Sequence, residues 1–216
     1  MRKKLLLQSR LYAILDKKTI ASFHKTAGSA KLAVVAEELA DAGVDIIQLR
    51  DKESSREILY EDAVCIKKAF ARKRVLFIIN DYPDLAKIVD SDGVHLGQND
   101  CSVAVARRIL GPEKLIGVSC HSLGQALKAE EDGADYIGIG PVFPTPTKPE
   151  YKAVGTAVLR ELKEVLRIPF FAIGNVNCET VAQIRLAGAD RFAVCRDFIA
   201  GDNIRQAVRE FAKAAL

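Results

Sequence analysis

This 216-residue sequence has few cysteines. It also lacks apolar runs of membrane length and concentrated basic stretches. The five cysteines are scattered and never form a CxxC pair, which argues against a zinc site or a disulfide framework and favours reduced thiols in a cytoplasmic protein. The apolar run Leu5–Leu7 stops at Gln8, too short for the core of a signal peptide. No window approaches the ~18 apolar residues of a membrane span. We therefore expect neither a leader nor a membrane anchor.

The charges are nearly balanced and spread along the chain, with 32 Lys and Arg against 28 Asp and Glu. A nucleic-acid-binding protein usually concentrates its basic residues in a stripe. We therefore expect small-molecule partners and neither a nucleic acid nor a membrane, and we leave a homo-oligomer open. With 49% hydrophobic and 28% charged residues, the composition excludes disorder and predicts a packed core.

Short apolar runs alternate with amphipathic helical patterns along the whole length. Most of the runs are continuously hydrophobic, as expected of parallel strands buried on both faces. The predicted strands are Leu11–Leu15, Asp45–Leu49, Val75–Ile79, Gly93–Leu96, Leu115–Val118, Tyr136–Ile139, Phe170–Ile173 and Arg191–Val194. A glycine recurs where a helix ends and a strand begins, at Gly43, Gly93, Gly133 and Gly188. Glycine there can adopt the left-handed conformation that closes a helix, so the repeat predicts a series of βα units.

Eight such units in about 200 residues predict an α/β fold, a single (β/α)₈ TIM barrel. We expect one domain over residues 1–216, with residues 1–10 as an N-terminal extension. The alternative is an open doubly wound sheet, which more often carries a GxGxxG loop after its first strand. Here Asp16, Lys17 and Lys18 follow that strand, so the barrel is favoured.

In a TIM barrel the chemistry takes place at the carboxyl ends of the strands, and polar side chains follow the second predicted strand. Period-two alternation places Gln48, Arg50 and Lys52 on one side, towards the barrel mouth. A glutamine and an arginine are costly to bury there without a ligand or a counter-charge. We therefore expect an anionic ligand at these residues. The alternative is a surface ion pair between Arg50 and Asp51.

Asn80 and Asp81 end the third unit's strand, and Asp100 follows the fourth. Two carboxylates at neighbouring strand ends can share one hard cation, and Mg²⁺ in such sites keeps waters and takes phosphate oxygens. The sequence therefore predicts a Mg²⁺ site at Asp81 and Asp100. The alternative is that each aspartate is a turn residue or the N-cap of the helix that follows it.

The fifth strand is followed by Ser119, Cys120, His121 and Ser122. His121 can carry a proton and Ser119 can bind a phosphate or hydroxyl group, while Ser122 is placed to cap the next helix. Cys120 has no base at a fixed spacing, so we do not expect a cysteine nucleophile. His95, inside the fourth strand, is expected to be a core or mouth histidine rather than a catalyst.

The last three βα loops have the composition of an anion site. Prolines stiffen the loop after strand six, where two threonines and a lysine suit closure over an anionic ligand. In many barrels the last two loops hold a phosphate through backbone N–H groups, and an arginine adds a charge-assisted contact. The alternative for the loop after strand six is an ordinary turn. For the last two loops the alternative is a strand-end glycine at Gly174 and a solvated arginine at Arg196. The candidate residues are Thr145, Thr147, Lys148, Gly174, Asn175, Cys195 and Arg196.

Taken in order, these segments resemble thiamine-phosphate synthases over nearly the whole chain, from Tyr12 to the strand-eight loop. The motifs that carry the resemblance are residues 48–52, 79–81, 93–100, 117–119 and 140–148. The resemblance implies a Mg²⁺-dependent transferase of thiamine biosynthesis. Such an enzyme joins 4-amino-2-methyl-5-(diphosphooxymethyl)pyrimidine to 4-methyl-5-(2-phosphooxyethyl)thiazole and releases pyrophosphate.

The resemblance also assigns roles to the candidate residues. It implies an ionisation in which the leaving diphosphate must be stabilised and no protein nucleophile is needed. The catalytic set is Arg50, Lys52, Lys148 and Ser119. The pyrimidine diphosphate site is Gln48, Arg50, Lys52, Asn80 and Lys148, with Ser119 nearby. The Mg²⁺ ligands are Asp81 and Asp100. The thiazole phosphate site is Thr145, Thr147, Gly174, Asn175, Cys195 and Arg196.

Three features depart from the usual family pattern. Asn175 stands where the family usually has a second glycine, and Cys195–Arg196 replaces a Val-Ser pair. Both changes fall on the thiazole phosphate site. The stretch Lys17–Ala30 is expected to be longer and more irregular than a usual first βα connection. Two alternatives follow: a related thiazole tautomerase, in which His121 would move a proton, and a non-catalytic barrel that binds a phosphate ligand.

Overall fold

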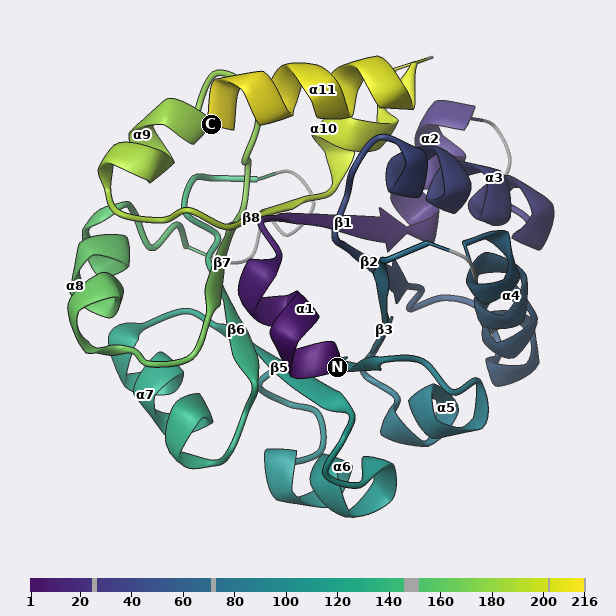
Figure 1. Cartoon of the computed structure of the whole chain (residues 1–216), viewed down its shortest axis with the longest axis horizontal. Coiled ribbons are helices and arrows are strands. Elements are labelled where there is room, and N and C mark those ends of the chain that lie inside the picture. Colours follow the sequence, from purple (N-terminus) through teal and green to yellow (C-terminus); the bar gives the residue numbers. More distant parts are fainter. Residues whose placement is uncertain (25–26, 71–72, 146–151, 202, 216) are drawn as a thin grey trace.

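A computed structural model describes residues 1–24, 27–70, 73–145, 152–201 and 203–215 of the chain. Eight parallel strands close into a barrel in sequence order, and β8 pairs with β1 (Figure 1). The strands are β1 Leu11–Asp16, β2 Ile46–Arg50, β3 Leu76–Asn80, β4 Gly93–Leu96, β5 Leu115–Cys120, β6 Tyr136–Ile139, β7 Phe170–Ile173 and β8 Phe192–Val194. The predicted (β/α)₈ TIM barrel is confirmed, and the open sheet is excluded.

Helices α2 to α11 surround the barrel, with two helices after β1, two after β8 and one after each of the other strands in the described residues (Figure 1). The helices are α1 Arg2–Gln8, α2 Lys17–His24, α3 Ser29–Asp41, α4 Arg56–Ala69, α5 Pro83–Ile88, α6 Val103–Leu110, α7 Leu123–Glu131, α8 Ala157–Val165, α9 Val181–Leu186, α10 Arg196–Ile199 and α11 Ile204–Ala215. Serine side chains start three of them by accepting a backbone N–H, as N-caps do. These caps are Ser55 on α4, Ser102 on α6 and the predicted cap Ser122 on α7.

Much of the stretch Lys17–Ala30, which was expected to be irregular, is helical: α2 begins directly after β1 and runs to His24. Asp16 Oδ1 accepts hydrogen bonds from the backbone N–H of Thr19 at 2.8 Å and from its hydroxyl at 2.7 Å. A carboxylate that accepts the third helical N–H stabilises the first turn of a helix. The side chain of Asp16, the last residue of β1, thus stabilises the start of α2, which begins at the next residue.

The buried side chains form two layers, because successive residues of a strand point to opposite faces. Residues such as Leu15, Leu49 and Ile79 point outwards and pack under the helices. The inward residues include Tyr12, which packs in the barrel interior with the largest rings there, Tyr136 and Phe171. Helix α1 lies across the amino-terminal end of the barrel (Figure 1), and its buried Leu6 joins this inner cluster. The carboxyl end is left for the site.

The glycines at the helix-to-strand junctions follow the predicted conformation in three cases of four. Gly43, Gly133 and Gly188 have φ angles of 98°, 89° and 101°, in the left-handed region where a side chain is strained. Gly93 instead lies inside β4. A Cβ there would lie 2.2 Å from the carbonyl oxygen of Leu115, so this glycine is required for close strand contact rather than for helix closure.

Among the helices that the structure describes, none combines the length and the apolar composition needed to cross a bilayer.

Candidate functional site

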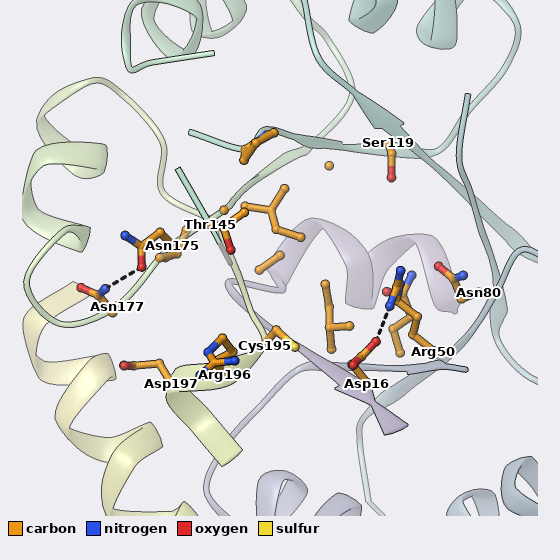
Figure 2. A pocket seen from close by; sticks show the side chains of 18 of the residues that line it. Asp16, Arg50, Asn80, Ser119, Thr145, Asn175, Asn177, Cys195, Arg196 and Asp197 are labelled. Atoms are coloured by element: carbon orange, nitrogen blue, oxygen red, sulfur yellow. Dashed lines mark hydrogen bonds and ion pairs between the residues drawn. The ribbon is translucent and has the colours of Figure 1, made fainter. Parts of the chain in front are cut away.

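A cavity of about 380 Å³ opens at the carboxyl ends of the barrel strands (Figure 2). Its walls come from β1 through β8 and from the loops that follow several of them. The predicted site residues that line it are Gln48, Arg50, Asn80, Ser119, Thr145, Gly174, Asn175, Cys195 and Arg196. The predicted residues Thr147 and Lys148 lie outside the described residues.

Arg50 is paired with Asp16 at the mouth of the cavity. Its Nη1 donates to Asp16 Oδ2, and both side chains line the cavity (Figure 2). The alternative surface pair between Arg50 and Asp51 is wrong, because Asp51 is buried and lies 3.3 Å from the ammonium of Lys17. The guanidinium, with five N–H donors, retains N–H groups for a ligand.

Two buried amides line the cavity next to Arg50. Gln48 is 2% exposed and Asn80 is 9% exposed. Within the described residues, Gln48 Nε2 and Asn80 Nδ2 have no hydrogen-bond partner. A buried unpaired donor costs free energy, so both N–H₂ groups favour a ligand rich in acceptor oxygens.

Lys52 does not face the cavity, contrary to the alternation argument. Strand β2 ends at Arg50, so the period of two does not extend to residue 52. The half-exposed Lys52 side chain instead places its Nζ 3.1 Å from Asp81 Oδ2. Lys52 therefore pairs with Asp81, one of the two predicted metal ligands, and is not among the residues that line the cavity.

Asp81 and Asp100 lie near each other, outside the cavity wall. Burial raises the pKa of Asp81, the neighbouring Asp100 carboxyl raises it further, and the Lys52 ammonium opposes both effects. Neither aspartate caps a helix, because the N-caps of α5 and α6 are Tyr82 and Ser102. Asp81 also has a left-handed φ of 66°. The N-cap alternative is therefore wrong for both residues. The turn alternative holds for Asp100, whose Oδ2 accepts a hydrogen bond of 2.6 Å from the backbone N–H of Gly97.

The polar residues of β4 and β5 meet inside the cavity wall. His95 Nε2 lies 2.9 Å from Ser119 Oγ, and both residues line the cavity. His121 Nδ1 instead contacts the carbonyl oxygen of Gly140. Cys120 is buried, which raises its pKa to about 12, so it does not form a nucleophilic thiolate at neutral pH.

The loop after β7 holds two consecutive left-handed residues, Gly174 with φ 99° and Asn175 with φ 51°. A Cβ on Gly174 would lie 2.4 Å from Pro141 Cα, so only glycine fits there. Asparagine, as at position 175, is among the non-glycine residues that tolerate this conformation. The Oδ1 of Asn175 accepts a hydrogen bond of 3.2 Å from Asn177 Nδ2 (Figure 2).

Arg196 begins α10 after β8, and its guanidinium lies 4.9 Å from the ring centre of Phe23 on α2. Both side chains line the cavity. The alternative of a solvated arginine holds in part. Arg196 is exposed, but its guanidinium also packs on an aromatic face. Burial raises the pKa of the neighbouring Cys195 to about 12, so this thiol stays neutral.

Asp16 and Phe23 are cavity residues that the sequence reasoning missed. Asp16 ends β1, and the strand-end rule that selected Asn80 would also have selected it. Phe23 carries no such signal, because the first connection was expected to be irregular and its helix was not anticipated.

The chain is similar to known proteins of one family. The family model described as thiamine monophosphate synthase matches residues 11–198. The thiamine-phosphate synthase of Shouchella clausii is 45% identical over 199 residues, covering 92% of each chain. The thiamine-phosphate synthase of Caldanaerobacter subterraneus is 40% identical over 208 residues and covers 94% of each. A solved thiamine phosphate pyrophosphorylase from Pyrococcus furiosus superposes with a TM-score of 0.84 at 32% identity, covering 99% of this chain and 96% of that one.

Proposed function

The chain belongs to the thiamine monophosphate synthase family, and we propose that it is a transferase acting on two phosphorylated small molecules. It joins the pyrimidine methyl diphosphate to the thiazole phosphate and releases pyrophosphate. One observation carries the proposal: donors for an anion stand at two opposite sides of one cavity. Figure 2 shows Arg50 and Asn80 on one side and Asn175 and Arg196 on the other.

The side with Arg50 suits the diphosphate. Arg50 is charged, and the buried amide groups of Gln48 and Asn80 are donors without partners among the described residues. Charge-assisted and preorganised hydrogen bonds stabilise an anion most where water is excluded. We assign Lys52 and Lys148 to the same diphosphate, following the family resemblance.

The reaction needs stabilisation of a leaving group rather than a nucleophilic side chain. When the C–O bond breaks, negative charge develops on the diphosphate and positive charge on the pyrimidine methyl group. Donors that face the diphosphate lower the energy of this state, and the thiazole nitrogen then captures the cation. The raised pKa values of Cys120 and Cys195 agree with the absence of a thiolate from this scheme.

Asp81 and Asp100 have the properties of a Mg²⁺ site. Two carboxylates close enough to raise the pKa of Asp81 gain stability from a divalent cation between them. Among the described residues, no group of three or more His, Cys, Asp or Glu side chains could hold a metal. The two aspartates would therefore share the ion with waters and with phosphate oxygens, as Mg²⁺ sites do. Bound there, the ion would neutralise charge on the diphosphate.

The side with Arg196 suits the single phosphate of the thiazole. Its guanidinium is supported by the Phe23 ring, and the backbone turns sharply at Gly174 and Asn175 beside it.

We also place the reaction in the cytoplasm, because all five cysteines are free and free thiols persist in a reducing compartment.

Pyrophosphate release tests the proposal directly. Purified protein is mixed with Mg²⁺ and both substrates, and we expect release that stops when either substrate or the metal is omitted. Arg50→Gln should lower kcat/KM roughly a hundredfold. Arg205→Gln should leave it unchanged, because Arg205 is an exposed partner of Asp41 on the outer helices.

Other results would overturn the proposal. Isomerisation of a thiazole carboxylate without pyrophosphate release would identify a tautomerase. Binding of the thiazole phosphate without turnover of either substrate would identify a phosphate-binding barrel.

A further inference from the structure

Four side chains form a hydrogen-bonded chain from the barrel interior to the cavity. The hydroxyl oxygens of Tyr12 and Tyr136 are 3.1 Å apart. The Tyr136 hydroxyl lies 3.3 Å from His95 Nδ1, and His95 Nε2 lies 2.9 Å from Ser119 Oγ. Of these four side chains, only His95 and Ser119 line the cavity. The chain thus connects two fully buried phenols to a hydroxyl at the substrate site.

The barrel interior makes room for this chain. A Cβ on Gly117 would lie 2.2 Å from Tyr136 Cζ and 2.5 Å from its hydroxyl oxygen. Any other residue at position 117 would displace the phenol from its place beside His95. The Tyr136 ring also packs edge-on against Phe171, with ring centres 5.8 Å apart. The hydroxyl is therefore held by packing as well as by its hydrogen bonds.

Tyr12, at the buried end of this hydrogen-bonded chain, determines the direction of the hydrogen bonds along it. Tyr12 is 2% exposed, and among the described residues its hydroxyl has one hydrogen-bond partner, Tyr136. A buried O–H without an acceptor is costly. Tyr12 therefore donates to Tyr136, and Tyr136 in turn donates to His95 Nδ1.

This direction determines the protonation of the imidazole. Because Nδ1 accepts, the proton of a neutral ring is on Nε2, and Nε2 donates to Ser119 Oγ. With the opposite tautomer, or a doubly protonated ring, Nδ1–H would donate to the Tyr136 oxygen, and in the described part of the chain the two phenol hydrogens would have only one acceptor between them, each other's oxygen. One buried hydroxyl hydrogen would then lack an acceptor.

We propose that His95 is a positioning residue, held by Tyr136 as the Nε2–H tautomer, which directs the Ser119 hydroxyl hydrogen into the cavity. Ser119 Oγ accepts from His95, so its own O–H donates to an acceptor atom of the bound substrate. This role rests on the proposed function for the identity of that substrate. The hydrogen-bond direction is a property of the protein alone.

The tautomer is measured without substrate. The chain has three histidines, so two-bond ¹H–¹⁵N correlation spectra are assigned with His24→Gln and His121→Gln variants. We expect the His95 ring to carry a proton at Nε2 and none at Nδ1. Protonation at Nδ1, or at both nitrogens, would overturn the proposal. Because no turnover is involved, this result stands whether or not the protein releases pyrophosphate.

The kinetic test uses Tyr136→Phe, which keeps the ring and removes the hydroxyl. We expect kcat for pyrophosphate release to fall roughly tenfold, with KM changed less than twofold. In a Ser119→Ala background the same change should lower kcat less than twofold, because the effect passes through Ser119. Tyr60→Phe is the matched control, since this tyrosine is exposed on α4.

A merely structural tyrosine gives a different result. Its loss would lower kcat by the same factor in both backgrounds, and that outcome would overturn the proposal. If Tyr136→Phe does not fold, the tautomer of His95 measured in the wild-type protein alone tests the proposal. If the wild-type protein releases no pyrophosphate, the proposed function fails and the spectra still test the hydrogen-bond direction.

Discussion

Asp16 holds Arg50 at the mouth of the barrel. One carboxylate oxygen accepts from Arg50 Nη1, and the other accepts twice from Thr19 at the start of α2. The two residues are register partners on β1 and β2, so the ion pair joins the ends of neighbouring strands. The orientation of the cavity's arginine therefore depends on the residue that also begins the first helix.

Asp16→Asn should reduce activity by misplacing Arg50. A hydrogen bond to a charged group contributes ~1.5–3 kcal/mol, so we expect kcat/KM for the pyrimidine diphosphate to fall roughly ten- to a hundredfold in steady-state assays. Asp190→Asn is the control, because Asp190 pairs with Arg191 at the opposite end of the barrel. Equal losses in both variants would contradict the role assigned to Asp16.

Mg²⁺ should stabilise the protein through Asp81 and Asp100. At ten times its dissociation constant, a ligand contributes about 1.4 kcal/mol, which is roughly 3–6 °C in Tm for a chain of this size. Thermal melts should show this shift for the wild type and not for Asp81→Asn or Asp100→Asn. The shift should shrink at acidic pH, because the raised pKa of Asp81 lets protons compete with the metal.

Asp84→Asn is the control for the metal melts. Asp84 is exposed on the neighbouring α5 and pairs with Arg56. Its variant should keep the full Mg²⁺ shift, and the metal assignment fails if it does not.

Arg196→Gln should affect one substrate only. Removing a charge-assisted contact should raise KM for the thiazole phosphate about tenfold and leave KM for the pyrimidine diphosphate unchanged. Initial rates with each substrate varied in turn measure the two constants. Arg185→Gln, an exposed position on α9, should change neither. A rise in both constants would argue against a separate thiazole site.

Gly174→Ala should destabilise the fold much more than Gly28→Ala, which changes only the N-cap of α3 and should cost less than ~1 kcal/mol. The new methyl at 174 would overlap Pro141 and strain a left-handed residue, for an expected loss of more than ~2 kcal/mol in urea unfolding. Gly28 has a φ of −67° and open space around its Cα. Equal stability of the two variants would mean that the loop after β7 relaxes freely.

Asp51→Asn should cost stability at neutral pH but not in acid. Burial opposes the charged form of Asp51, but hydrogen bonds from Ser54 and Glu53 and the Lys17 ammonium outweigh it and lower the pKa. A lowered carboxyl pKa contributes stability above the unfolded-state value near 3.9 and loses it as the pH falls through the folded-state value.

Urea unfolding should therefore show a deficit of about 2 kcal/mol for Asp51→Asn at pH 7, which shrinks below about pH 4. Asp132→Asn is the control, because Asp132 is an exposed partner of Lys128. Its deficit should stay below ~0.5 kcal/mol at both pH values. A deficit for Asp51→Asn that does not depend on pH would contradict the charged role.

The strands were predictable because burial on both faces leaves a continuous apolar run in the sequence. The predicted ends differ from the observed ones by at most two residues. The cavity residues Gln48, Asn80 and Ser119 followed from the same pattern, since strand ends meet at one end of a barrel. Lys52 was misplaced because alternation holds only while the chain remains a strand, and β2 ends at Arg50.

By itself the sequence determined the barrel, the end of it that carries the chemistry, and the family resemblance. These depend on local periodicity and on residue types at strand ends. Only the tertiary structure decided that Asp16 pairs with Arg50, that Arg196 stacks on Phe23 and that Tyr12 begins a hydrogen-bonded chain to the cavity. Each of these is a contact between side chains far apart in the sequence. The closure of the barrel brings them together, and no local pattern encodes the partners.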